Sequence, residues 1–154
     1  MLFYNKVIKK LINKKISVSF AESCTGGLLS STFISYSGVS KIYNLGLITY
    51  SNSSKEKLLK IPKVKIIKYG SVSEEIAILM VKNLKKISKS KLCISVTGIA
   101  GPSGGTKIKP VGLVYIGFLL ENKLYILKKN FNGSRKIIQK KIINSIFRNI
   151  DKLI

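Results

Sequence analysis

Residues 113–131, LVYIGFLLENKLYILKKNF, form two apolar runs separated by Glu121 and Asn122. A two-residue polar break between two such runs predicts an antiparallel hairpin that turns at Glu121–Asn122. Upstream of residue 113, strand candidates alternate with helix candidates, an order typical of parallel strands joined by helices. The chain is therefore predicted to be an α/β protein, with helices packed in a three-layer α/β/α arrangement on a mixed central sheet.

The rest of the chain supplies the elements for that sheet and its helices. We expect helices at residues 2–14, 26–35, 53–60, 73–89 and 134–150, and strands at 16–21, 42–51 and 92–97. Ser73 is the expected N-cap of its helix, and Glu74 and Glu75 follow in the first turn, where the helix dipole favours carboxylates. We prefer this structural role for the two glutamates to a catalytic pair.

The length and composition indicate one globular domain. The chain has 154 residues, 45% of them hydrophobic, so we expect residues 1–154 to form a single domain with its own core. The longest apolar stretch, residues 113–120, is shorter than the roughly 20 residues that a bilayer requires, and we expect no membrane partner. Two cysteines without a disulfide framework favour a reducing, cytoplasmic setting.

The net charge of +22 raises the alternative of a nucleic-acid-binding protein. Only Arg135 and Arg148 are arginines, whereas arginine is the residue that clamps phosphates and reads base edges. The lysines are spread over nearly every segment instead of clustering in one. We therefore interpret the charge as a solvated lysine surface and expect no nucleic-acid partner.

Missing residue types restrict the chemistry further. The sequence contains no histidine, which excludes Ser-His-Asp and Cys-His catalysis and histidine metal sites. It contains only six carboxylate side chains, and none of them form a set that suggests a metal centre. We therefore predict no metal, and the base of any enzyme here would be a lysine, a tyrosine or a lone glutamate.

The first of three candidate site loops is ESCTGG, residues 22–27. If Gly26 and Gly27 open a helix, Ser23 to Thr25 lie at its amino end, where free N–H groups could hold an anion or a developing oxyanion. Cys24 is a rival nucleophile that would need the helix dipole and nearby lysines to form its thiolate. Simple capping of the helix by Ser23 or Thr25 explains the same residues equally well.

The second loop is TYSNSSK, residues 49–55, in which Tyr50 is expected to end a strand and Lys55 to begin a helix. Serine enzymes without histidine use lysine as their base, so a pairing of Lys55 with Ser23 is chemically sensible. An ordinary lysine, with a pKa of about 10.4, is neutral in only about one molecule in 2,500 at pH 7. Lowering this pKa to about 7 would require roughly 4–5 kcal/mol of desolvation and like-charge repulsion. Tyr50 could hold the amine or relay a proton.

The third loop is TGIAGPSGGT, residues 97–106. It lacks the spacing of a P-loop and leads into a strand instead of a helix. Its glycines let the backbone approach a ligand closely, and a nest of N–H groups would suit a phosphate. A long turn between two strands is an equally good interpretation of the same residues.

Taken together and in order, five motifs resemble those of the CinA carboxy-terminal domain family, over about residues 4 to 150. They are AESCTGG (21–27), G-x-x-T-Y-S-N-x-x-K (46–55), G-x-V-S-E-E (70–75), TGIAGPSGG (97–105) and KPVGLVY (109–115). Any one of these motifs is weak, whereas five in order are highly specific. Ser103 and Lys107 depart from the pattern, because members often carry acidic residues there.

The resemblance implies an amidohydrolase that converts nicotinamide mononucleotide to nicotinate mononucleotide and ammonia, without a cofactor, in pyridine-nucleotide salvage. It implies Ser23 as nucleophile, Lys55 as base and Tyr50 as a third catalytic residue. The substrate-binding positions that it implies are Cys24, Thr25, Gly26, Gly27, Thr97, Gly98, Ala100, Gly101 and Arg135. It also suggests a homodimer. A non-catalytic nucleotide-binding member of the family remains the main alternative.

Overall fold

A five-stranded mixed sheet forms the middle layer of the protein. The computed structural model describes residues 2–154. The strands are β1 (Val18–Glu22), β2 (Tyr43–Ile48), β3 (Leu92–Gly98), β4 (Leu113–Leu120) and β5 (Lys123–Asn130), in the spatial order β2-β1-β3-β4-β5. Strand β1 pairs in parallel with β2 and β3, whereas β4 is antiparallel to both β3 and β5. The predicted mixed sheet is confirmed.

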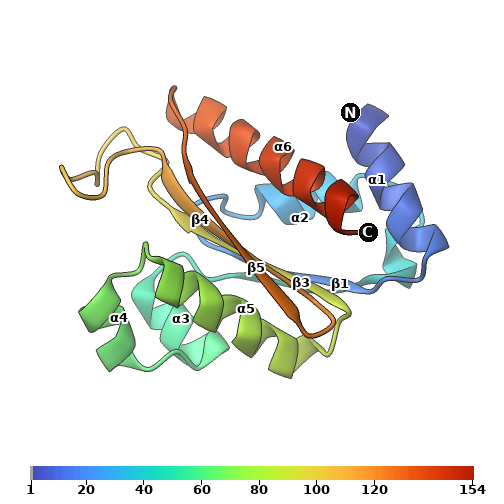
Figure 1. Cartoon of the computed structure of the whole chain (residues 1–154), viewed down its shortest axis with the longest axis horizontal. Helices are drawn as coiled ribbons and strands as arrows, with labels where there is room; N and C mark the ends of the chain where they lie inside the picture. Colours follow the sequence, from blue (N-terminus) through green and yellow to red (C-terminus); the bar gives the residue numbers. More distant parts are fainter. Residues whose placement is uncertain (1) are drawn as a thin grey trace.

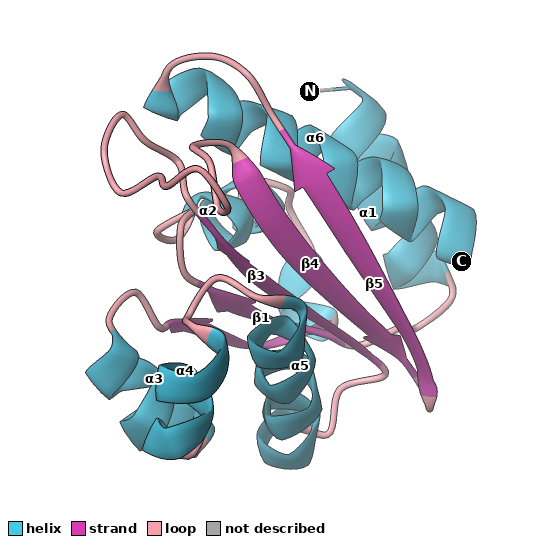
Figure 2. Cartoon of the chain, turned by 60° about the vertical axis from the view of Figure 1, so that its left-hand side comes forward, coloured by secondary structure: helices cyan, strands magenta, loops and turns pink. Residues whose placement is uncertain are grey.

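Helices cover both faces of this sheet and complete the predicted three layers (Figures 1 and 2). One face carries α1 (Leu2–Asn13), α2 (Leu28–Ile34) and α6 (Arg135–Leu153). The opposite face carries α3 (Asn52–Leu59), α4 (Lys63–Tyr69) and α5 (Glu74–Ser88). A short 3-10 helix, Val39–Lys41, leads into β2.

Two hydrophobic cores hold the layers together, one on each face of the sheet. Alternate residues of a strand point to opposite faces, so Ile94 of β3 packs beneath α1, α2 and α6 while Cys93 packs beneath α5. The larger core contains the isoleucine stripe of α6, including Ile138, Ile142 and Ile146, all with no exposed surface. Complete burial of each such side chain contributes about 1.5–3 kcal/mol.

Most local predictions are confirmed at the level of the element. The hairpin turns where predicted, because Leu120 pairs with Lys123 and Glu121 adopts a left-handed φ of 52°. Ser73 caps α5, and its side chain accepts a hydrogen bond from the N–H of Ile76. The prediction that Tyr50 ends a strand is wrong, because β2 stops at Ile48.

The parallel strands direct three loops to one edge of the sheet. Glu22 of β1 lies in register with Ile48 of β2 and with Val96 of β3, so the three chains leave the sheet side by side. Ligands of layered α/β proteins gather at such strand ends. The loops after β1, β2 and β3 are the ones that the sequence singled out.

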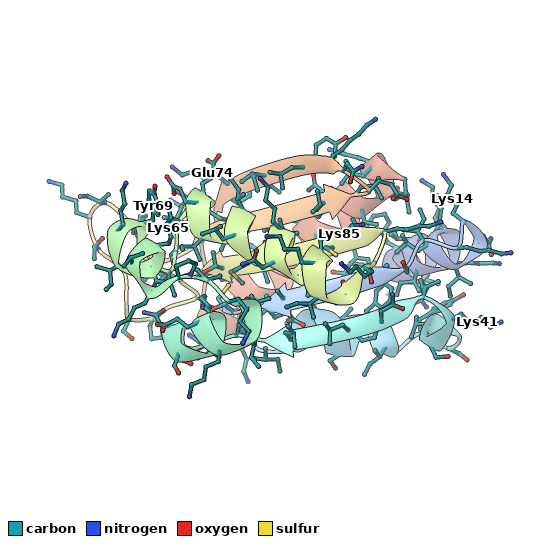
Figure 3. All side chains as sticks on the ribbon, turned by 90° about the horizontal axis from the view of Figure 1, so that it is seen from below. Lys14, Lys41, Lys65, Tyr69, Glu74 and Lys85 are labelled. Carbon is teal, nitrogen blue, oxygen red and sulfur yellow. The ribbon has the colours of Figure 1, made fainter. Side chains whose placement is uncertain are left out.

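The lysines cover the molecule from end to end. Figure 3 shows Lys14 and Lys41 at one end, Lys65 near the other, and Lys85 between them. Within residues 2–154, no helix is both long enough and apolar enough to cross a membrane.

Candidate active site

Ser23 and Lys55 form the centre of the site. Ser23 directly follows β1, and Lys55 lies in the first turn of α3, in the loop-helix segment after β2. The Nζ atom of Lys55 lies 3.1 Å from Oγ of Ser23 and 2.7 Å from the main-chain oxygen of Thr49. Only 1% of Lys55 and 7% of Ser23 are exposed. The hydroxyl and the amine are thus in hydrogen-bond contact in a place with little water.

Burial changes the basicity of the lysine. Desolvation lowers the pKa of Lys55 to about 8, and the neighbouring Cys24 partly opposes this shift. Burial thus achieves most of the lowering that the serine-lysine hypothesis requires, without repulsion from other lysines. At pH 7 roughly one molecule in ten then carries a neutral amine beside Ser23.

Cys24 is the rival nucleophile, and its environment disfavours the thiolate. Its side chain is 4% exposed, and this burial raises the pKa of Cys24 to about 12. Lys55 and Arg135 act in the opposite direction but do not offset the desolvation. The thiol therefore stays protonated at neutral pH, which leaves Ser23 as the better nucleophile.

Glu22 has a structural role that the sequence did not reveal. Its carboxylate is fully buried and accepts hydrogen bonds from the N–H groups of Gly27, Leu29 and Ser30 at 2.8–3.1 Å. The hydroxyls of Thr25 and Ser30 add two more bonds at 2.6 Å each. The carboxylate thus occupies the amino end of α2, where we had expected a ligand anion or oxyanion.

The amides left for an oxyanion are therefore fewer than expected. The N–H of Gly26 donates to the carbonyl of Ser23, and that of Gly27 donates to Glu22. Gly26 and Gly27 both have positive φ, and they form the turn that returns the chain to α2. Within the described chain, the N–H groups of Cys24 and Thr25 are the ones in this turn without a hydrogen-bond acceptor in another residue.

A cavity of about 290 Å³ opens in front of Ser23. It is small for a ligand site, since such pockets usually measure about 300–1,000 Å³. Lys55 is buried and does not line it. The lining comprises Ser23, Cys24, Tyr50, Ser71, Val72, Thr97, Gly98, Ile99, Ala100, Gly101, Ser103, Gly104 and Arg135. All three loops that the sequence singled out therefore contribute to one cavity.

Arg135 lies at the mouth of this cavity, at the start of α6. Its Nη1 donates to the carbonyl of Gly101 at 2.7 Å, and its Nη2 donates to the hydroxyl of Tyr50 at 3.0 Å. Lys55 instead contacts the main-chain oxygen of Tyr50, at 3.5 Å. The Tyr50 hydroxyl therefore lies at the cavity mouth, where it contacts the guanidinium of Arg135, and it does not contact the amine of Lys55.

The remaining predicted residues divide between the cavity and its support. Thr97 is almost fully buried, and its hydroxyl donates to the carbonyl of Ser71 at 2.7 Å. Gly98 has no room for a side chain, because a Cβ there would lie 2.8 Å from the carbonyl oxygen of Leu113. Thr25 does not line the cavity and instead bonds Glu22.

Among residues 2–154 no group of three or more acidic, cysteine or histidine side chains is placed to hold a metal ion. The cavity is thus lined by a hydroxyl, which a buried amine contacts, and by a guanidinium, and the turn beside it has unused backbone N–H groups. These groups suit addition to a carbonyl with stabilisation of the resulting oxyanion.

A profile of the CinA C-terminal domain matches residues 3–154. The chain belongs to this family. A CinA-like protein of Petrotoga mobilis is 47% identical over 144 residues, which are 94% of this chain and 36% of that protein. The chain thus spans about a third of the length of the curated relatives that it matches.

Solved CinA structures share the fold. A CinA superfamily protein from Klebsiella pneumoniae has a TM-score of 0.93 at 22% identity, covering 97% of this chain and 94% of that one. The competence/damage inducible protein CihA from Agrobacterium tumefaciens has a TM-score of 0.92 at 28% identity, covering 98% and 95%. The three-layer architecture with its mixed sheet is thus the CinA fold.

Sequence reasoning about this CinA chain missed two parts of the site. It interpreted Glu22 only as part of a polar motif, because Glu22 ends β1, several residues before α2, where no local capping pattern marks it. It also did not place Ser71 and Val72 at the cavity. They lie within the motif G-x-V-S-E-E, which was interpreted only as a helix start.

Proposed function

We propose that this CinA domain is an amidohydrolase that cleaves the carboxamide of nicotinamide mononucleotide to nicotinate mononucleotide and ammonia. The contact of 3.1 Å between Oγ of Ser23 and Nζ of Lys55, beside a cavity, is the observation that carries the proposal. The family resemblance supplies the substrate. The lowered pKa of Lys55 supports its role as base, since a neutral amine is then accessible near pH 7–8.

The proposed chemistry has two halves. Ser23 Oγ attacks the carboxamide carbon while neutral Lys55 takes its proton, and the oxyanion is stabilised by the N–H group of Cys24, a residue that lines the cavity. Protonated Lys55 then donates its proton to the departing nitrogen, which leaves as ammonia. Water deprotonated by the same amine hydrolyses the acyl-enzyme and regenerates Ser23.

The other end of the substrate would bind at the cavity mouth. Arg135 is the cation positioned there, and its planar guanidinium suits the two oxygens of a phosphate. The glycine-rich wall from Gly98 to Gly101 lets the backbone approach the nucleotide closely. In this proposal Tyr50 holds Arg135 and shapes the cavity mouth, because its hydroxyl contacts the guanidinium.

Ammonia release from nicotinamide mononucleotide tests the proposal. We expect the wild type to release ammonia. In Ser23→Ala we expect kcat to fall at least about a thousandfold, as for the removal of other serine nucleophiles. Ser31→Ala is the control, because Ser31 is exposed on α2 and outside the cavity. If the wild type releases no ammonia but still binds the nucleotide, the chain is instead the non-catalytic, nucleotide-binding member of the family considered above.

Two further expectations stay proposals. The resemblance suggests a homodimer, which sedimentation of the purified protein would test. The two cysteines, Cys24 and Cys93, are free thiols and favour a reducing compartment such as the cytoplasm.

A further inference from the structure

Two motifs of the sequence have no part in the chemistry proposed above, and the structure brings them together. Lys109 begins the motif KPVGLVY, and Gly70 begins the motif G-x-V-S-E-E. The ammonium of Lys109 donates to the carbonyl of Tyr69, the residue before Gly70, at 2.8 Å. A Cβ on residue 70 would lie 2.8 Å from this nitrogen, so the glycine makes room for the lysine.

This bond belongs to a set of three that fix the segment between α4 and α5. Lys109 binds the carbonyl of Tyr69, Ser73 binds that of Gly70 at 2.8 Å, and Thr97 binds that of Ser71 at 2.7 Å. Three successive carbonyls thus have side-chain donors. Ser73 belongs to the cap of α5, whereas Thr97 belongs to β3 and Lys109 to the loop between β3 and β4. Segment 69–72 is therefore tied to β3 and to the loop after it, not only to its own helices.

The loop between β3 and β4, which carries Lys109, is packed against itself. The loop after β3 runs out through Gly101 and Gly105 and returns through Lys109 and Val111. A Cβ on Gly101 would lie 2.5 Å from a methyl group of Val111, and one on Gly105 would lie 2.7 Å from its nitrogen. The two arms therefore touch at Val111. Fixing Lys109 on the returning arm also fixes the outgoing arm, which lines the cavity.

We infer that Lys109 is a positioning residue that clamps segment 69–72 to the glycine-rich loop and so sets the separation of the two walls between which the substrate binds. The first wall is segment 69–72, of which Ser71 and Val72 line the cavity, and the second is the glycine-rich loop, of which Gly98 to Gly101 line it. Lys109 itself is not part of the lining and contacts neither Ser23 nor Lys55. Its effect is on binding, because a preformed cavity reduces the ordering cost of the ligand.

The inference rests on the proposed function for its kinetic readout. Lys109→Met removes the donor and keeps most of the aliphatic chain. We expect KM for nicotinamide mononucleotide to rise about tenfold, the scale of one lost charge-assisted hydrogen bond, with kcat within about twofold. Lys109→Arg keeps a charged donor and should restore KM to within about threefold of wild type.

Lys107→Met is the matched control. Lys107 lies on the same loop, is exposed and has the same charge, but makes no side-chain hydrogen bond among the described residues. We expect this variant to keep the wild-type KM to within about twofold, because Lys107 does not line the cavity and solvent and salt screen an exposed charge. An equal rise of KM in Lys109→Met and Lys107→Met would show an effect of charge alone and overturn the clamp. A lower kcat at constant KM in Lys109→Met would also overturn it.

Amide hydrogen exchange of residues 70–72 provides a readout that needs no substrate. We expect exchange at least about tenfold faster in Lys109→Met and unchanged in Lys107→Met. An exchange rate of residues 70–72 in Lys109→Met equal to that of the wild type would refute the clamp. If the wild type neither binds nor hydrolyses the nucleotide, the proposed function is wrong. Amide hydrogen exchange of residues 70–72 then still tests the clamp, because it needs no substrate. Should Lys109→Met not fold, Lys109→Gln serves as the second variant with the same readouts.

Discussion

At the scale of single residues, the buried position of Lys55 is the most consequential feature. A lysine normally keeps its charge in water, and a chain with 28 basic residues has many that do. Lys55 is 1% exposed, and its nitrogen contacts a carbonyl oxygen and the hydroxyl of Ser23. Burial of this ammonium costs desolvation free energy, which a lysine on the surface does not lose.

The rate should follow the neutral form of this amine. Because burial lowers the pKa of Lys55 to about 8, kcat/KM should rise about tenfold per unit at pH values below 7 and level off above pH 8–9. An initial-rate profile from pH 5.5 to 10 on a stable substrate measures this. A rate that falls across that range would contradict the assignment of Lys55 as base.

Burial of the lysine also affects stability, with a definite sign. The pKa of Lys55 is lower in the folded protein than in the unfolded chain, so the unfolded state binds more protons between about pH 8 and 10.5. The free energy of unfolding therefore rises with pH in that interval by about 2–3 kcal/mol from this group.

Lys55→Met should abolish turnover and yet stabilise the protein. We expect a gain of about 1–3 kcal/mol in the free energy of unfolding at pH 7, which shrinks as the pH rises from 8 to 10.5. Urea titrations at several pH values check this. Lys57→Met is the control, since Lys57 is exposed on the same helix. A strongly destabilised Lys55→Met would mean that the amine's hydrogen bonds outweigh its desolvation.

The thiol of Cys24 should be inert despite its place beside Ser23. Burial raises the pKa of Cys24 to about 12, and a thiol reagent needs the exposed thiolate. We expect the native protein to react with iodoacetamide at least about a hundredfold more slowly than the unfolded chain. Rapid alkylation of Cys24 in the native protein, located by mass spectrometry, would reinstate it as a candidate nucleophile.

At the scale of elements, helix α2 depends on a carboxylate from the preceding strand. Five hydrogen bonds converge on Glu22, three of them from N–H groups in and before the first turn of α2. Such a carboxylate satisfies donors that would otherwise be buried without partners. It also orients the turn that carries Ser23.

Glu22→Gln should therefore destabilise the whole domain. The amide keeps the shape but replaces one accepting oxygen with a donor that faces other donors. We expect a loss of about 2–4 kcal/mol in the free energy of unfolding, as for a buried charge-assisted network, measured by urea titration. Glu56→Gln is the control, because Glu56 makes no side-chain hydrogen bond in the described chain. A loss equal to that of the control would contradict the role of Glu22.

The elements also show what the sequence could predict. The hairpin, the capped helix α5 and the buried strand β3 were predictable because each has a strong local signal. Helix α4 was missed, since Val64, Ile66 and Ile67 are β-branched and only Pro62 marks its start. Helix α2 begins at Leu28, later than expected, because Gly27 adopts a left-handed φ of 97°.

For the site, residue types were predictable and their partners were not. The absence of histidine directed attention to Ser23 and Lys55, and the structure brings these two together. The partner of the Tyr50 hydroxyl, Arg135, lies 85 positions away, and no local pattern shows such a contact. The bond between Lys109 and Tyr69, 40 positions apart, was hidden for the same reason.

At the scale of the whole molecule, excess positive charge is largely unpaired. Within residues 2–154 the structure shows one ion pair, between Lys10 and Asp151 at 3.3 Å. The lysines labelled in Figure 3, Lys14, Lys41, Lys65 and Lys85, are distributed over the full length of the molecule. A field of this sign attracts anions from every side without specifying one.

Capture of an anionic substrate should therefore depend on salt. We expect kcat/KM for nicotinamide mononucleotide to fall about tenfold between 20 and 500 mM NaCl, with kcat little changed. Nicotinamide riboside, which lacks the phosphate, is the control and should show no such fall. Equal salt dependence for both substrates would show that the charge acts on the protein's own stability instead.

The order of the site residues along the chain has a consequence for how such a protein could diverge. The groups proposed to break the bond lie between positions 22 and 55, whereas the cavity walls come mostly from positions 71 to 135. Duplicated copies could accumulate changes in the later stretch and acquire new amides as substrates while the earlier stretch stayed constant. Grafting loop 98–112 from one homologue into another is thus the natural way to exchange substrate preference.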